Sequence, residues 1–158
     1  MNDFFGFSGY AKIYSVFWLF YSIWSARKAI ISEEQRLKEI QEIIDGVIGL
    51  MRMLPVSVMR GLYASIWLVL TAIDGLGLAL LFHFTGGDRW AKLLIVIALL
   101  GIVHGVRMLF DNLRSMDDED ALRASLLDGL GKWMVRWSNL SLIARVLAAV
   151  ILAVVVHL

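Results

Sequence analysis

The sequence predicts an all-α integral membrane protein: a bundle of four transmembrane helices plus two cytoplasmic or interfacial amphipathic helices. The chain has 158 residues, 59% of them hydrophobic and 18% charged. Its mean hydropathy of +0.75 is too high for an ordinary soluble domain. Because a single proline leaves no proline-rich linker, residues 1–158 are expected to form one domain. The membrane segments are expected at about 4–26, 58–84, 89–110 and 139–158, and the amphipathic helices at 33–54 and 117–137.

The first membrane segment, residues 4–26, is dominated by aromatic side chains and stops at Arg27 and Lys28. Small polar residues and one lysine recur along it at helical spacing: Ser8, Lys12, Ser15, Ser22 and Ser25. Such a stripe is typical of a seam between closely packed helices. A pore lining is the alternative interpretation.

The segment 33–54 is predicted to be an amphipathic helix that begins with a capping box, Ser32 followed by Gln35. Apolar residues then recur at alternating steps of three and four, as in a heptad seam: Leu37, Ile40, Ile44, Val47 and Met51. Glu34 and Lys38 have the spacing of an ion pair on the opposite, hydrated face. The seam rests on the membrane surface, packs within its own bundle, or joins the chain to a second copy or a partner protein.

The second and third membrane segments, 58–84 and 89–110, are predicted to form an antiparallel hairpin. Ser57 is placed to cap the first of these helices. The tripeptide 86–88, Gly-Gly-Asp, predicts a tight turn between them. Because the connection is so short, the two helices must be neighbours.

The polar segment between the third and fourth membrane helices is predicted to hold the amphipathic helix 117–137. The acidic run Asp117–Asp120 suits the start of a helix, whose dipole favours negative charge, and it lacks the spacing of a calcium-binding loop. Five apolar residues share one face, with two tryptophans as interfacial anchors: Leu122, Leu126, Leu130, Trp133 and Trp137.

The distribution of basic residues predicts the orientation. Most lie between the first and second membrane segments or between the third and fourth, and the opposite side has mainly Arg89 and Lys92. Since short cytoplasmic segments are enriched in lysine and arginine, both termini are expected on the non-cytoplasmic side of a bacterial-type inner (plasma) membrane.

Asp74 lies near the middle of the second membrane segment, where an ionised side chain needs a partner. If the hairpin turns at Asp88, His104 is about two residues deeper than Asp74 toward the cytoplasm, and Arg107 about three further. Both side chains can reach Asp74, and Asp111 continues the polar groups outward. The cluster would form a half-channel for protons or cations, or a structural ion pair between Asp74 and Arg107 that conducts nothing.

Small residues are predicted to bring the hairpin helices close together. One stripe consists of Thr71, Gly75 and Ala79, and it is expected to face Gly101 and Gly105 on the other helix. The last membrane segment carries Arg145, which snorkels to the headgroups or bridges to Asp74 or Asp111.

The sequence contains no motif of a known enzyme class, and we expect no catalytic activity and no cofactor. There is no cysteine, three scattered histidines do not predict a metal site, and a net charge of +1 disfavours nucleic acid as a partner. Two functions remain. One is a homo-oligomeric ion- or proton-conducting pore that uses the Asp74 cluster. The other is a membrane anchor or assembly subunit that presents residues 33–54 and 117–137 to a cytoplasmic protein.

Overall fold

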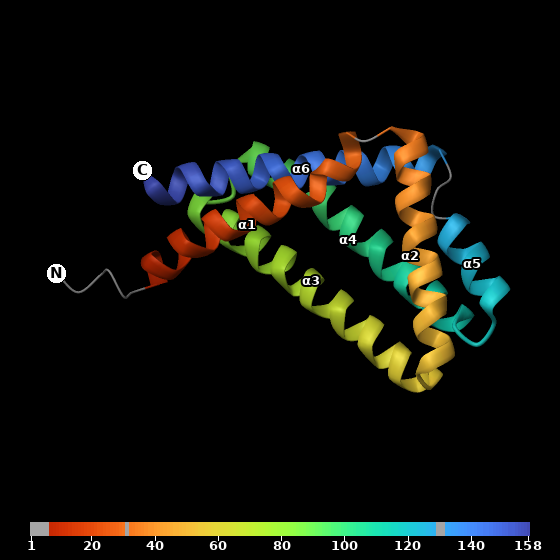
Figure 1. The fold of residues 1–158 in the computed structure, drawn as a ribbon. Coiled ribbons are helices and arrows are strands. Elements are labelled where there is room, and N and C mark those ends of the chain that lie inside the picture. Colours follow the sequence, from red (N-terminus) through yellow and green to blue (C-terminus); the bar gives the residue numbers. More distant parts are fainter. Residues whose placement is uncertain (1–6, 31, 129–131) are drawn as a thin grey trace.

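The computed structural model describes residues 7–30, 32–128 and 132–158, which form six α-helices and no strand. The helices are α1 (Phe7–Ile30), α2 (Glu33–Met53), α3 (Val56–Thr85), α4 (Arg89–Ser115), α5 (Glu119–Asp128) and α6 (Lys132–His157). Four long helices, α1, α3, α4 and α6, form the body of the molecule, and α2 and α5 run across one end of it (Figure 1). The prediction of an all-α fold is confirmed.

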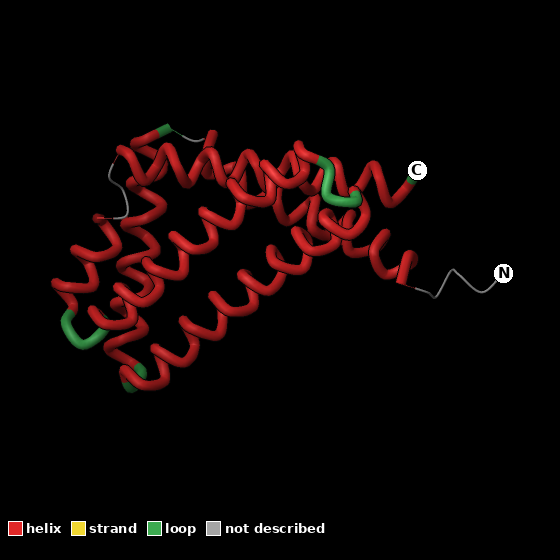
Figure 2. The backbone as a smooth tube through the Cα atoms, turned by 180° about the vertical axis from the view of Figure 1, so that it is seen from behind, coloured by secondary structure: helices red, strands yellow, loops and turns green. Residues whose placement is uncertain are grey.

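The two ends of the bundle differ in which connections they carry. The α3–α4 turn lies at the same end as the start of α1 and the end of α6, and we call this the hairpin end. The opposite end, which α2 and α5 cover, is called the α2–α5 end. Figure 2 shows the same arrangement from behind, with short loops between α2 and α3, between α3 and α4, and between α4 and α5.

Three of the described helices are long and apolar enough to cross a membrane: α3, α4 and residues 138–157 of α6. The fourth predicted membrane segment, 4–26, corresponds to α1, which is not among the three. Its tyrosines, its serines and Lys12 lower its mean hydropathy. Since α1 nevertheless packs along α6 over an extensive interface, it belongs to the same bundle.

The hairpin turn forms as predicted, with two glycines in the left-handed region of backbone space. Gly86 has φ 61° and Gly87 has φ 75°, values that side chains with a Cβ rarely adopt. Asp88 follows at the N-cap of α4, where its Oδ1 accepts a hydrogen bond from the backbone N–H of Arg89 at 2.7 Å. The turn therefore directs α4 back along α3.

Helix starts at the α2–α5 end differ in part from the prediction. Ser32 caps α2 as expected, its Oγ accepting from the Gln35 N–H at 3.2 Å. Helix α3 begins at Val56, after Pro55 at the N-cap position, so Ser57 is not its cap. A proline fits there because the first residues of a helix have no intrahelical use for an N–H.

The predicted amphipathic helix 117–137 is shorter than expected. Helix α5 ends at Asp128, and Lys132 already begins α6, which continues without interruption to His157. The intervening sequence contains two glycines, which are poor helix formers. Trp133 and Trp137 therefore lie on the first turns of α6 and not on α5; their side chains, and Leu130, are outside the described part of the chain.

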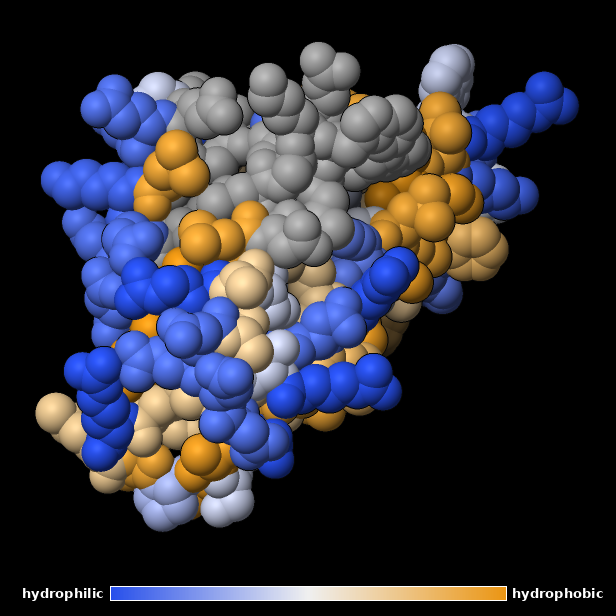
Figure 3. Space-filling view, turned by 90° about the vertical axis from the view of Figure 1, so that its right-hand side faces the viewer, coloured by the Kyte–Doolittle hydropathy of each residue, from blue (hydrophilic) through white to orange (hydrophobic). Residues whose placement is uncertain are grey.

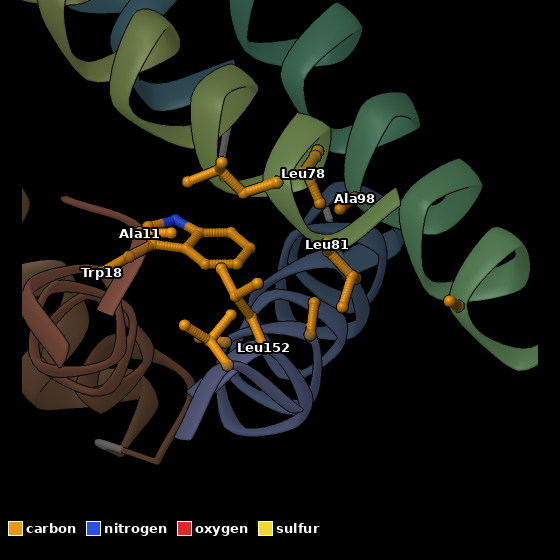
Figure 4. Packing of buried hydrophobic residues seen from close by; sticks show 11 residues of the cluster. Ala11, Trp18, Leu78, Leu81, Ala98 and Leu152 are labelled. Carbon is orange, nitrogen blue, oxygen red and sulfur yellow. The ribbon is translucent and has the colours of Figure 1, made fainter. Parts of the chain in front are cut away.

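The main apolar core lies in the half of the bundle nearer the hairpin end. It joins α1, α3, α4 and α6, as Figure 4 shows for Trp18, Leu78, Leu81, Ala98 and Leu152. Alanines supply much of the contact surface of α4 and α6, with Ala98, Ala148 and Ala149 fully buried. Because these side chains are small, the helix backbones approach closely.

Candidate functional site

The candidate site is a buried ion pair between Asp74 of α3 and Arg145 of α6. The exposed fractions of the two side chains are 6% and 16%, and Arg145 Nη1 contacts Asp74 Oδ2 directly. The other carboxylate oxygen, Oδ1, accepts a hydrogen bond from the indole N–H of Trp18 at 3.2 Å. Three helices, α1, α3 and α6, thus meet at one carboxylate.

The lengths of the helices bring the three residues to one level. Trp18 is eleven residues after the start of α1, Asp74 eleven before the end of α3, and Arg145 twelve before the end of α6. At 1.5 Å per residue, each lies about 16–18 Å from the hairpin end. The site is therefore in the middle of the bundle, at the edge of the apolar core that is farther from the hairpin end.

Aromatic side chains of α1 hold the site together. The indole of Trp18 is completely buried and lies against Gly77 of α3, where an added Cβ would overlap the ring. The Tyr14 hydroxyl donates to the backbone carbonyl of Ile73 at 2.5 Å. A single glycine thus makes room for the tryptophan that contacts Asp74.

Both carboxylate oxygens of Asp74 have donors. Arg145 contacts Oδ2 through a charge-assisted hydrogen bond, and the indole N–H of Trp18 donates to Oδ1. Another cation could bind this carboxylate only by displacing Arg145.

The predicted cluster of Asp74, His104 and Arg107 does not form. Arg107 is 82% exposed and lies 4.0 Å from Asp111, one turn further along α4. His104 is half-buried, and within the described residues it makes neither a hydrogen bond nor an ion pair. The reason is that α6 packs against both helices of the hairpin, which places Arg145 beside Asp74. Of the two roles left open for Arg145, the bridge to Asp74 is the one present.

The small residues of the hairpin pack differently from the prediction. Gly101 lies against Ser141 of α6 and not against α3, whereas Gly105 does contact α3, since a Cβ there would come within 2.8 Å of Trp67. Gly75 and Ala79 are exposed and Thr71 is half-buried, so this stripe is not the contact face.

The polar stripe of α1 is a packing seam at its centre. Ser15 and Ser22 are buried and share a face with the buried Ala11 and Trp18. Ser8 and Lys12 are exposed and Ser25 is half-buried. The Ser15 hydroxyl bonds to the carbonyl of Lys12 at 2.7 Å, within its own helix.

The heptad seam of α2 is partly covered by the chain itself. Ile44 is fully buried, Val47 and Met51 are half-buried, and Leu37 is 48% exposed; the side chain of Ile40 is outside the described part of the structure. Helix α2 contacts α3 and α5, so the seam packs within its own bundle at its centre.

The acidic run Asp117–Asp120 forms ion pairs with neighbouring arginines and caps the start of α5. Asp117 pairs with Arg60 at 2.5 Å and Glu119 with Arg52 at 3.0 Å. Asp118 Oδ1 accepts from the backbone N–H of Asp120 at 2.9 Å, as at a helix start. Behind them Asn112 is buried, donating to the Tyr63 hydroxyl at 3.0 Å and accepting from Ser125 at 2.8 Å.

No group of side chains suited to a metal ion occurs among the described residues. No family model matches the chain, and comparison with curated proteins and with solved structures finds no similar protein. The function must therefore be argued from the site.

Trp18, Tyr14 and Gly77 are the residues of the site that the sequence interpretation missed. A signal for Trp18 was present, because it follows Ala11 and Ser15 and precedes Ser22 on one helix face. A buried carboxylate also needs N–H donors, which tryptophan can supply.

Proposed function

We propose that this protein is a non-catalytic membrane anchor or assembly subunit that presents its α2–α5 end to a cytoplasmic partner protein. The observation that carries the proposal is the closed Asp74–Arg145 pair, in which the buried charges neutralise each other and hold three helices in register. Such a pair suits a structural part better than an ion path. We place α1, α3, α4 and α6 across the membrane with the α2–α5 end on the cytoplasmic side, following the basic residues near that end.

The surface offered to a partner is the hydrated side of α2 together with α5. Glu34, Lys38, Glu42 and Asp45 are exposed on α2. Figure 3 looks at this end of the molecule and shows hydrophilic side chains over much of it. Ion pairs such as Asp45–Arg123, at 3.3 Å, join α2 to α5, so that the two helices present one continuous surface.

The test is ion flux through the purified protein in sealed vesicles. We expect the wild type and Asp74→Asn to show the same low proton and potassium leak as empty vesicles. A wild-type leak that Asp74→Asn abolishes, while the variant keeps its helical content and elution volume, would overturn the anchor proposal.

A homo-oligomeric proton- or cation-conducting pore is the second candidate, and one observation favours it. Ser138, Ser141 and Arg145 share a face of α6, so polar groups lead from the α2–α5 end to Asp74. A small bundle needs several copies to enclose an aqueous path. Native mass spectrometry in nanodiscs separates the candidates: a defined ring supports the pore, and a monomer excludes it.

A further inference from the structure

Helix α2 has a second apolar line that the described part of the chain leaves exposed. Ile44 and Ile48 form the buried side of the helix. Ile43, Leu50 and Leu54 are 51%, 44% and 36% exposed, and with the half-buried Val47 they recur at steps of four, three and four. This spacing puts Ile43, Val47 and Leu50 on one strip in the C-terminal half of the helix, beside the buried side, and Leu54 at the C-cap follows the strip.

Both ends of α2 are held close to long helices of the bundle by two-residue connections. Residues 31–32 separate it from α1, and Leu54 and Pro55 separate it from α3. A connection of two residues has three Cα–Cα steps and therefore spans at most about 11 Å. If α1 and α3 cross the membrane, both ends of α2 must therefore lie at the membrane surface, and the helix runs across the bundle rather than away from it (Figure 1).

The end of α1 carries side chains typical of the headgroup level. Trp24 is 59% exposed, and the guanidinium of Arg27 lies 5.7 Å from the centre of its ring. Tryptophan and arginine together favour the boundary between acyl chains and water. Helix α2 begins six residues after Arg27, so its N-terminal end lies close to this level.

Apolar surface also continues from α2 into the long apolar helix α3. Leu54 and Val58, on either side of Pro55, are 36% and 51% exposed, and no charged residue lies between them. Val58 opens the exposed apolar side of α3, which faces lipid if α3 spans. A surface continuous with a lipid-facing one is most simply covered by the same lipid.

We propose that α2 lies in the surface of the cytoplasmic leaflet, with Ile43, Val47, Leu50 and Leu54 inserted among phospholipid chains. Its charged face, with Glu34, Lys38 and Glu42, points to water and stays free for a protein. The inference rests on the membrane placement proposed above, and it adds that lipid, not a protein, covers the uncovered apolar line.

Since the chain contains no cysteine, the test can use single-cysteine variants labelled with a nitroxide. The label is placed at Ile43 or Leu50 on the proposed lipid side. Matched controls carry it at Glu42, next in sequence but on the charged face, and at Gly46, where nothing lies within 4 Å of an added Cβ. Val103 of α4, 65% exposed, reports independently on the membrane placement.

The full-length protein is reconstituted in vesicles of phosphatidylethanolamine and phosphatidylglycerol, and collision rates are measured with oxygen, which concentrates in lipid, and with a water-soluble nickel chelate. We expect labels at Ile43, Leu50 and Val103 to favour oxygen, and labels at Glu42 and Gly46 to favour nickel.

Any other pattern of collision rates contradicts either the lipid contact of α2 or the membrane placement of the bundle. Nickel-favouring labels at Ile43 and Leu50, with Val103 favouring oxygen, would overturn the lipid contact and leave the membrane placement intact. Protection of Ile43 and Leu50 from both reagents would mean that a second copy covers them, which also overturns it. A nickel-favouring label at Val103 would overturn the placement itself, and the proposed function with it.

Discussion

The two halves of the bundle are held together by different mixtures of contacts. Toward the hairpin end, Trp18, Leu81, Ala98 and Leu152 are completely buried, and contacts are apolar and close. Toward the α2–α5 end, polar contacts accompany a smaller set of buried apolar residues: the buried Asn112, the bond from Arg60 Nε to the carbonyl of Leu113 at 3.0 Å, and ion pairs at the surface. The buried apolar residues of this half are Ile44, Ile48, Met59, Met116 and Leu122.

The Asp74–Arg145 pair lies at the boundary between the two halves. The apolar half depends on matching shapes, so it tolerates little change in side-chain volume. The α2–α5 half has fewer buried apolar residues and relies in part on hydrogen bonds that water can replace. We therefore predict that it opens with a smaller loss of free energy than the hairpin half.

The largest effect is expected from breaking the pair at the boundary. Asp74→Leu leaves the Arg145 charge buried without its partner, which in proteins costs about 3–5 kcal/mol. We expect the free energy of unfolding, measured by SDS titration in mixed micelles, to fall by that amount. The double variant Asp74→Leu/Arg145→Leu should regain most of the loss, since no unpaired charge remains.

The exposed pair on α4 provides the control. Arg107→Leu/Asp111→Leu removes an ion pair of the same chemistry whose side chains are 82% and 55% exposed. Exposed pairs contribute about 0–1 kcal/mol. If Asp74→Leu were no more destabilising than this control, the boundary pair would have no role in holding the two halves together.

Two glycines of α3, two residues apart, test how tight the apolar half is. Gly77→Ala places a Cβ in the ring of the buried Trp18, and overpacking of this kind costs about 1–3 kcal/mol. Gly75→Ala meets nothing within 4 Å and replaces a poor helix former, so it should be neutral or stabilise by up to about 1 kcal/mol. The same SDS titration measures both variants. A similar loss of stability in both variants would contradict the assignment of the Gly77→Ala effect to the fit of Trp18, because Gly75→Ala leaves that contact intact.

The comparison also explains what the sequence could predict. The all-helical fold, the Gly86–Gly87 turn and the Ser32 cap depend on local signals and were predicted correctly, whereas the boundary between α5 and α6 was not. The burial of Asp74 was predicted from the cost of a charge in an apolar helix. These features need no knowledge of which helices touch.

The partner of Asp74 could not be found in this way. The interpretation assumed that a short hairpin turn puts α3 and α4 face to face along their whole length, which led to His104 and Arg107. In the structure α6 packs against both helices, and Gly101 faces Ser141 of α6 instead of Gly75. Register within a hairpin is local, but the choice of neighbour depends on where a third helix packs, and periodicity does not encode that.

The smallest effect is expected from removing one hydrogen bond in the α2–α5 half. Tyr63→Phe takes away the hydroxyl that accepts from Asn112, leaving a buried N–H without a partner. The loss should be about 1 kcal/mol. In deuterium exchange we expect faster exchange in α5, which Asn112 holds through Ser125 at 2.8 Å, and unchanged protection near Leu81.

Tyr10→Phe is the matched control. Tyr10 is 68% exposed, so the loss of its hydroxyl leaves no buried donor without a partner. It should change neither stability nor exchange. If Tyr63→Phe instead raised exchange equally in α5 and around Leu81, the bundle would unfold as a single cooperative unit. The two halves would then differ in the mixture of contacts that holds them but not in their resistance to opening.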